Sequence, residues 1–171
     1  MERNERVFKL GKSVSLARAD LGSHQFICAS GESTDAIFAC PALTIDQSVS
    51  RYVPTFAYEF NDENAPENFL PPVSFPYGAA HATEIQYLMA LPTAAFPGTL
   101  SAQQQQLAAI MKGYWTNFAK HGSPASFGVP SWPLFNTLTQ KIQSLVPPAP
   151  QTETDFATTH NCAFWAVLEA S

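Results

Sequence analysis

The sequence predicts an α/β fold whose sheet is incomplete. Helical periodicity and strand-like alternation follow one another along the chain, and this interleaving is typical of an α/β domain. Only two segments fit a strand pattern convincingly. Two strands are too few for an independent sheet covered by helices on both faces, so we expect a portion of a larger sheet with helices packed against it.

The first clear pattern begins at Thr34 and is helical. Apolar residues recur at spacings of four and three along one face, at Phe38, Ala42, Ile45, Val49 and Tyr52. Pro41 lies inside this pattern, and we expect it to kink the helix or split it. Residues 55–60 then place aromatic side chains at alternate positions, which predicts a strand.

The best-defined helix is predicted for residues 102–120. Its apolar stripe is continuous and comprises Leu107, Ile110, Met111, Tyr114, Trp115 and Phe118. Ser101 and Gln104 have the spacing of a capping box, and Gly122 is suited to end the helix.

Two further elements are predicted towards the C-terminus. A short strand is expected over residues 143–146, and a proline-rich loop follows it. A last helix is expected over residues 155–168, with an inward face formed by Phe156, Cys162 and Trp165.

Composition and charge restrict the partners of this chain. Charged residues make up 13% of the sequence, against roughly 25% in a typical domain. Either the surface is covered by uncharged polar residues, or part of it is buried against more protein. The net charge of −5 gives no attraction to nucleic acid or anionic lipid, and no run approaches the roughly 18 apolar residues of a transmembrane helix. We expect neither nucleic acid nor a membrane as a partner.

His81 is the leading candidate for chemistry. It follows a long proline-rich loop and stands among small residues, namely Gly78, Ala79, Ala80 and Ala82. Long loops in compact domains are often functional, and small neighbours let another group approach an imidazole closely. A lone histidine is still more often structural. The other three histidines, His24, His121 and His160, stand in less suggestive surroundings.

A serine nucleophile of the usual hydrolase type is missing from the sequence. Such a nucleophile, placed on a strand-to-helix elbow, needs G-x-S-x-G because close packing there tolerates little beyond glycine. The nearest approach, Gly11-Lys-Ser13, lacks the second glycine. Neither a glycine-rich phosphate loop nor a histidine pair with metal-ligand spacing is present. We therefore expect neither a cofactor nor a metal.

Six blocks of the sequence resemble consecutive blocks of the type-B carboxylesterases, a family that includes bacterial para-nitrobenzyl esterases and the cholinesterases. The blocks are TDAIFACPA (34–42), PTFAYEF (54–60), GAAHATEIQYL (78–88), YWTNFAKHGSP (114–124), WPLF (132–135) and HNCAFW (160–165). They keep the family's order and approximate spacing, which is more specific than any single motif. The resemblance implies that residues 33–166 are the C-terminal part of an α/β-hydrolase domain. Residues 1–32 do not match these blocks, and residues 167–171 form a tail.

The resemblance implies catalytic roles for two residues. His81 corresponds to the general base, which takes the proton of the serine and later returns it to the leaving alcohol. Glu84 matches a recurrent family glutamate, which we interpret as support for the histidine; a charge beside a helix N-terminus is its alternative role. The family places the triad acid and the oxyanion hole nearer the N-terminus. The carboxylates in the matched blocks, Asp35, Glu59 and Asp62, are therefore not candidates for the triad acid.

The three cysteines allow one disulfide or three separate thiols. The resemblance implies a disulfide between Cys40 and Cys162 and leaves Cys28 unpaired. A disulfide favours an exported parent protein, and the family is often secreted or periplasmic. The first residues of this chain nevertheless lack the continuous apolar stretch of a secretion signal.

The function implied by the resemblance is hydrolysis of carboxylic esters. The chain is then the C-terminal segment of a serine esterase, inactive alone and acting on a small ester once an N-terminal half completes it. A non-catalytic, cholinesterase-like adhesion module and an inactive truncated gene product remain as alternatives. The aromatic residues near the His81 loop could line a substrate pocket or simply pack; they are Phe69, Phe75, Tyr77 and Phe96.

Overall fold

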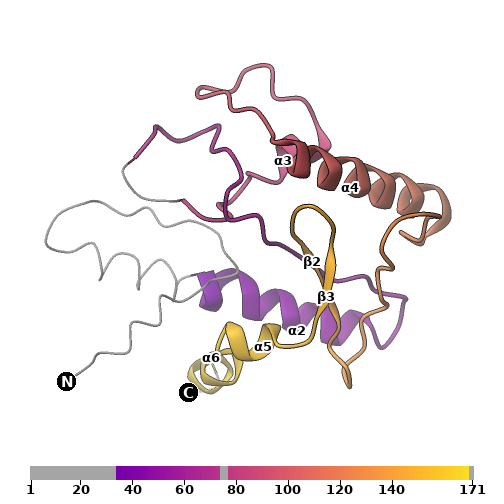
Figure 1. The fold of residues 1–171 in the computed structure, drawn as a ribbon. Coiled ribbons are helices and arrows are strands. Elements are labelled where there is room, and N and C mark those ends of the chain that lie inside the picture. Colours follow the sequence, from indigo (N-terminus) through magenta and orange to yellow (C-terminus); the bar gives the residue numbers. More distant parts are fainter. Residues whose placement is uncertain (1–33, 74–76, 170–171) are drawn as a thin grey trace, which may run out of the picture.

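The computed structural model describes residues 34–73 and 77–169. Helices and strands interleave along the chain, as predicted for an α/β fold (Figure 1). The elements are η1 (Asp35–Ala39), α2 (Cys40–Val49), β1 (Tyr58–Phe60), α3 (Ile85–Leu88), α4 (Ala102–His121), β2 (Ile142–Leu145), β3 (Gln151–Glu153), α5 (Phe156–Thr159) and α6 (Cys162–Glu169).

The sheet has three strands in the order β1-β2-β3. β1 pairs with β2 in parallel, with Tyr58 opposite Gln143, whereas β2 and β3 are antiparallel. In Figure 1, α3 and α4 lie above the sheet, and α2, α5 and α6 lie below it. β2 is buried along its whole length because it lies between the other two strands and is covered on both faces. Within the described residues, β1 and β3 are the sheet edges.

Sequence patterning does not predict β3, so the expectation of two strands is wrong by one. Its three residues, Gln-Thr-Glu, have no apolar alternation and are largely exposed. They form a strand because the chain reverses after β2 and pairs with it. The predicted strand at 55–60 is shorter than expected and covers only β1, although the carbonyls of Thr55 and Ala57 still accept hydrogen bonds from Phe135 and Gln143.

Two apolar clusters fill the space between the layers. The lower cluster comprises Ala39, Cys40, Leu43, Ala57, Phe135, Ile142, Phe156 and Cys162. The upper cluster comprises Ala65, Tyr87, Leu107, Ala108, Met111, Tyr114, Trp132 and Leu145. Ile142 of β2 enters the lower cluster and Leu145 the upper one, because side chains an odd number of positions apart in a strand point to opposite faces.

The helix α4 confirms its prediction. Ser101 and Gln104 form the capping box, in which each side chain accepts from the other residue's backbone N–H. Gly122 ends the helix with φ of 68°, a left-handed conformation that suits glycine. Among the residues that the structure describes, no helix is both long and apolar enough to cross a membrane.

The first helix begins with a π-helical turn, η1, and continues as α2. Pro41 lies in the first turn of α2, where its missing N–H is tolerated, so the expected kink or split takes the form of a change from π-helical to α-helical backbone just before the proline. The apolar face found in the sequence points outward. We name this face the outer stripe; its members, Phe38, Ala42, Ile45, Val49 and Tyr52, are all exposed.

The predicted last helix is instead two helices. α5 ends at Thr159 and α6 begins at Cys162, and Asn161 between them has φ of 52°. Asparagine is among the few residues that adopt this left-handed conformation readily, and it interrupts the helical periodicity. The predicted inward residues are correct, since Phe156 and Cys162 are buried and Trp165 packs against the lower cluster.

Candidate active site

His81 lies in a tight turn just before α3. The hydroxyl of Thr83 donates a 2.7 Å hydrogen bond to the carbonyl of Ala80, and the N–H of Thr83 donates to the same oxygen at 3.1 Å. Gly78 and Ala82 have φ of 70° and 72°, and such a conformation costs an alanine roughly 1 kcal/mol. The chain therefore holds a strained turn directly beside the candidate base.

The imidazole of His81 is exposed, while the two alanines before it are buried. The small residues thus let the backbone pack tightly beneath the turn and present the ring to the outside. The ring of Phe38 stacks on His81, with ring centroids 6.4 Å apart and planes inclined by 25°. No carboxylate of the described residues is hydrogen-bonded to this imidazole.

Glu84 lies at the N-cap of α3, three residues after His81. Its side chain makes no capping hydrogen bond, and within the described residues no hydrogen bond joins it to His81. Burial raises the pKa of the Tyr58 hydroxyl, and the charge of Glu84 raises that pKa further. The charge of Glu84 therefore acts on Tyr58, at the upper face of the sheet. The support of His81 by Glu84 stays a prediction.

Asp62 anchors the loop that precedes His81. Its carboxylate accepts a short hydrogen bond from the Tyr87 hydroxyl and a 2.7 Å bond from Gln104 Nε2. Burial, followed by the hydrogen bond and charge of Asp62, raises the pKa of Tyr87 far above its ordinary value, so the phenol remains the donor. These bonds tie the loop to α3 and α4, which is a structural role.

Three of the aromatic residues near the His81 loop lie among the described residues, namely Phe69, Tyr77 and Phe96. Phe69 is 45% exposed and Phe96 is 37% exposed, and the Tyr77 hydroxyl donates to the carbonyl of Pro71. Phe75 lies outside the described residues. A hollow of about 360 Å³ beside Gly78 includes Tyr77 and the acidic residues Glu63 and Glu67 in its lining.

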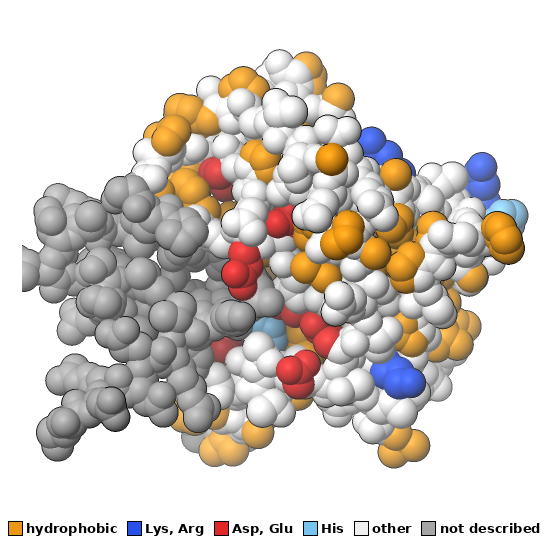
Figure 2. Space-filling view, viewed as in Figure 1, with side chains coloured by type: hydrophobic (Ala, Val, Ile, Leu, Met, Phe, Trp, Pro, Cys, Tyr) orange, Lys and Arg blue, Asp and Glu red, His pale blue; other side chains and the backbone are white. Residues whose placement is uncertain are grey.

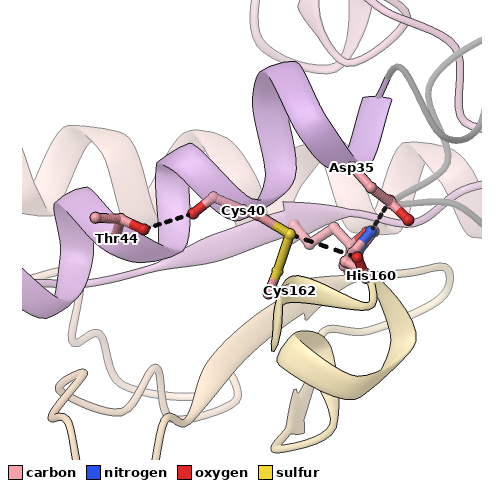
Figure 3. The surroundings of a disulfide bond; sticks show 6 residues. Asp35, Cys40, Thr44, His160 and Cys162 are labelled. Carbon is pink, nitrogen blue, oxygen red and sulfur yellow. Dashed lines mark hydrogen bonds and ion pairs between the residues drawn. A yellow bond between two sulfur atoms is a disulfide. The ribbon is translucent and has the colours of Figure 1, made fainter. Parts of the chain in front are cut away.

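Of the three histidines that the structure describes, His160 interacts most strongly, although sequence reasoning ranked it below His81. His160 is fully buried, and its ring lies between the carboxylates of Asp35 and Glu59; Figure 3 shows the contact with Asp35. Nδ1 lies 2.7 Å from Asp35 Oδ1, and Nε2 lies 3.2 Å from Glu59 Oε1. Asp35 and His160 are 125 residues apart, so no local spacing in the sequence could indicate the pair.

The surroundings of His160 raise its pKa. Burial alone would lower this pKa, but the hydrogen bonds and charges of Glu59 and Asp35 together outweigh the burial. Burial also raises the pKa of Asp35, against the lowering effect of His160. Because two carboxylates face one imidazole, we assign the positive charge to His160. The two carboxylates approach opposite ring nitrogens, and no metal-binding group of three such side chains occurs among the described residues.

This cluster predicts that stability falls as the solution becomes alkaline. The pKa of His160 is raised above its ordinary value of 6.5, so its stabilising contribution is complete below that pH. The contribution is lost as the pH rises through the higher pKa of the folded state. Melting temperatures measured from pH 6 to 9 should fall more steeply for the wild-type chain than for His160→Gln. Parallel profiles would show that His160 is not charged in the folded protein.

Cys40 and Cys162 form the disulfide that the family resemblance implies. It joins α2 to α6 beside the Asp35–His160 pair, so two links connect the same two parts of the chain (Figure 3). The sulfur of Cys40 lies 3.4 Å from the carbonyl oxygen of His160. This is a packing contact, because a disulfide sulfur carries no proton to donate. Cys28 lies outside the described residues.

Comparison with known proteins decides the family. A sequence model of the carboxylesterase family matches residues 27–165, which is most of the chain. The chain belongs to the carboxylesterase family. Acylcarnitine hydrolase of Mus musculus is 32% identical over 116 residues, which are 67% of this chain and 20% of that protein. Cocaine esterase of Homo sapiens is 31% identical over 119 residues, with the same two shares. This carboxylesterase chain thus spans about a fifth of the length of the curated relatives it matches.

Solved esterase structures share the arrangement of this carboxylesterase chain. A PNB esterase superimposes with a TM-score of 0.60 at 25% identity, over 85% of this chain and 28% of that chain. Another PNB esterase structure gives a TM-score of 0.56 at 26% identity, over 82% and 26% of the two chains. The three-stranded sheet and its helices are therefore part of the α/β-hydrolase fold of those esterases, as the resemblance predicts.

Proposed function

We propose that this chain is the histidine-bearing C-terminal segment of a serine ester hydrolase. The observation that carries the proposal is the placement of His81, which a strained turn of small residues presents to the outside. An exposed imidazole whose neighbours are small can meet a serine hydroxyl supplied by another segment. Carboxylic esters are the proposed substrate class, because the family hydrolyses them.

The proposed role of His81 is that of the general base. It removes the proton from the serine hydroxyl as the oxygen attacks the ester carbonyl, and the alkoxide of the ester leaves with that proton. Water then attacks the acyl-serine with the same assistance and releases the acid. Glu84 is the proposed source of negative charge near the base, whereas Asp35 and Glu59 are engaged with His160.

The described chain is proposed to be inactive without further protein. A histidine lacking an adjacent nucleophile cannot form the acyl-enzyme, and a bare imidazole has no donors to stabilise the oxyanion. The sequence contains no G-x-S-x-G. A non-catalytic adhesion module would also show no hydrolysis, so inactivity of the isolated chain does not distinguish it from a segment of an esterase. Hydrolysis that requires His81 once a serine-bearing portion has been supplied would distinguish them.

The first test is hydrolysis of p-nitrophenyl butyrate by the purified chain, with His81→Ala measured beside it. We expect both proteins to give the same rate as buffer, because the nucleophile and the oxyanion donors are not present. A rate above buffer that disappears in His81→Ala would mean that the chain provides its own nucleophile. That result would overturn the proposal that the site is incomplete.

A further inference from the structure

We propose that the helix pair formed by α5 and α6 detaches from η1 and α2 only when the Cys40–Cys162 disulfide is reduced and His160 is deprotonated at the same time. We name residues 156–169 the C-terminal pair. The inference goes beyond ester hydrolysis, because it concerns how these helices are attached. Figure 3 shows two attachments side by side: the disulfide joins α2 to α6, and His160 contacts Asp35 of η1.

Apolar packing holds α6 only in part. α6 contributes Cys162 and Trp165 to the lower cluster, and Trp165 is only partly buried. Its other large apolar side chains, Phe164, Val167 and Leu168, are each 50% or more exposed. Because apolar stabilisation is proportional to the area removed from water, α6 gains little from it. The attachment of α6 therefore depends largely on the disulfide and on the charged contacts of His160.

The charged contacts of His160 join three elements. Asp35 comes from η1 and approaches Nδ1, whereas Glu59 comes from β1 and approaches Nε2. α5 contributes an uncharged neighbour, since the ring of Phe156 packs against the imidazole with centroids 4.3 Å apart. The ring thus has a carboxylate at each nitrogen and an apolar group beside it. A positively charged imidazole can donate to both carboxylates.

The acidic surroundings extend to β3. The side-chain amide of Asn61 donates to Glu59 at 3.2 Å and to Glu153 of β3 at 3.5 Å. Figure 2 shows acidic side chains near the middle of one face, and the Lys and Arg side chains of that face lie away from them. Negative charge around the imidazole favours its protonated form.

Deprotonation removes the charge of His160 and one of its two hydrogen bonds. A neutral imidazole has a single N–H, so it can donate to Asp35 or to Glu59 but not to both. Burial lowers the pKa of His160, but the hydrogen bonds and charges of the two carboxylates raise it above its ordinary value. The charged contacts are therefore intact at pH 6 and are lost as the pH rises through the raised pKa.

The disulfide maintains the attachment when the charged contacts are lost. While it is intact, α6 stays joined to α2 at any pH. A dithiol reductant transfers two electrons and two protons to Cys40 and Cys162 and is itself oxidised to a disulfide, which leaves two thiols and no covalent link. Below the pKa of His160 the charged contacts still hold the C-terminal pair. Above that pKa neither attachment remains.

The test is hydrogen–deuterium exchange of the full chain at pH 6 and at pH 9, with and without a phosphine. The phosphine reduces the disulfide at both pH values and takes up the oxygen of water, whose two protons go to the thiols. Exchange is divided by the intrinsic rate at each pH. α4 is the internal reference, because it lies on the other side of the sheet from both attachments (Figure 1). We expect residues 156–169 to exchange at least about tenfold faster in the reduced chain at pH 9 than in the other three states, with α4 unchanged.

Three variants connect the pH response to His160. In the reduced chain, His160→Gln should exchange rapidly over residues 156–169 at both pH values. Glu59→Gln is milder, because His160 keeps Asp35, and it should lower the pH at which the reduced chain opens by about one unit. His121→Gln is the matched control, since His121 is exposed at the end of α4 and should leave this pH unchanged.

Other outcomes would overturn the proposal. Equal corrected exchange of the reduced chain at pH 6 and pH 9 would show that His160 does not hold the C-terminal pair. Rapid exchange at pH 9 with the disulfide intact would show that reduction is not required. Loss of protection in α4 together with residues 156–169 would mean that the whole chain unfolds. If the reduced His160→Gln chain is unfolded, Glu59→Gln decides, and an unshifted transition would overturn the inference.

Discussion

We expect His160→Ala to lower the free energy of unfolding by about 3–5 kcal/mol. His160 lies between Asp35 and Glu59, and both His160 and Asp35 are buried. Removing one member of a buried ion pair leaves the charge of the other in a medium of low polarity, and that cost is typically in this range. The variant also loses the contact between the His160 and Phe156 rings, whose centroids are 4.3 Å apart. Urea unfolding at pH 7, followed by circular dichroism, measures the difference.

His81→Ala is the matched control for this substitution. His81 is an exposed histidine in the same chain, and surface substitutions usually change stability by less than about 0.5 kcal/mol. A loss below about 1 kcal/mol in His160→Ala would show that the two carboxylates are solvated or protonated without the imidazole. It would then be wrong to describe this cluster as a stabilising ion pair.

We expect reduction of the Cys40–Cys162 disulfide to cost about 4–5 kcal/mol of stability. The two cysteines are 122 residues apart. Opening a loop of this length restores a large conformational entropy to the unfolded chain, and the chain-entropy relation gives the stated value. Urea unfolding with and without a phosphine reductant measures the loss.

The Cys40→Ala/Cys162→Ala variant isolates this effect. It should resemble the reduced wild-type chain and should not respond to the reductant. Mass spectrometry of differentially alkylated cysteines checks the pairing, with Cys28 expected to be labelled before reduction. Labelling of Cys40 or Cys162 at that stage would contradict the disulfide, and an unchanged midpoint would mean that the unfolded chain is already compact.

The sequence predicts best those elements whose signals are local. α4 has a continuous apolar stripe, a capping box and a terminal glycine, and all three act within a few residues of the helix. The sequence singles out His81 as a candidate for a similar reason, because the small residues adjoin the histidine. β3 could not be found this way, since Gln151–Glu153 becomes a strand only by pairing with β2. The break between α5 and α6 depends on a single asparagine, Asn161, inside a helical pattern.

The buried cluster around His160 could not be predicted from local patterns. Asp35 comes from η1, Glu59 from β1 and His160 from the corner between α5 and α6. Residues this far apart in the sequence form no periodic pattern from which their contact could be predicted. The outer stripe shows a second limit of sequence reasoning. An apolar helical face predicts burial, but the sequence does not say whether the burying partner is among the residues at hand.

The links between η1–α2 and α5–α6 also determine when this fold can close during synthesis. Cys162 and His160 leave the ribosome more than a hundred residues after their partners Cys40 and Asp35. Contacts of such large sequence separation form slowly, because a long loop must be closed before they can stabilise anything. Until α5 and α6 have been synthesised, these helices cannot cover Leu43 and the Cys40 thiol. The apolar inner side of α2 therefore stays exposed on the nascent chain while the intervening residues are synthesised, and Cys40 can form this disulfide only once Cys162 has emerged.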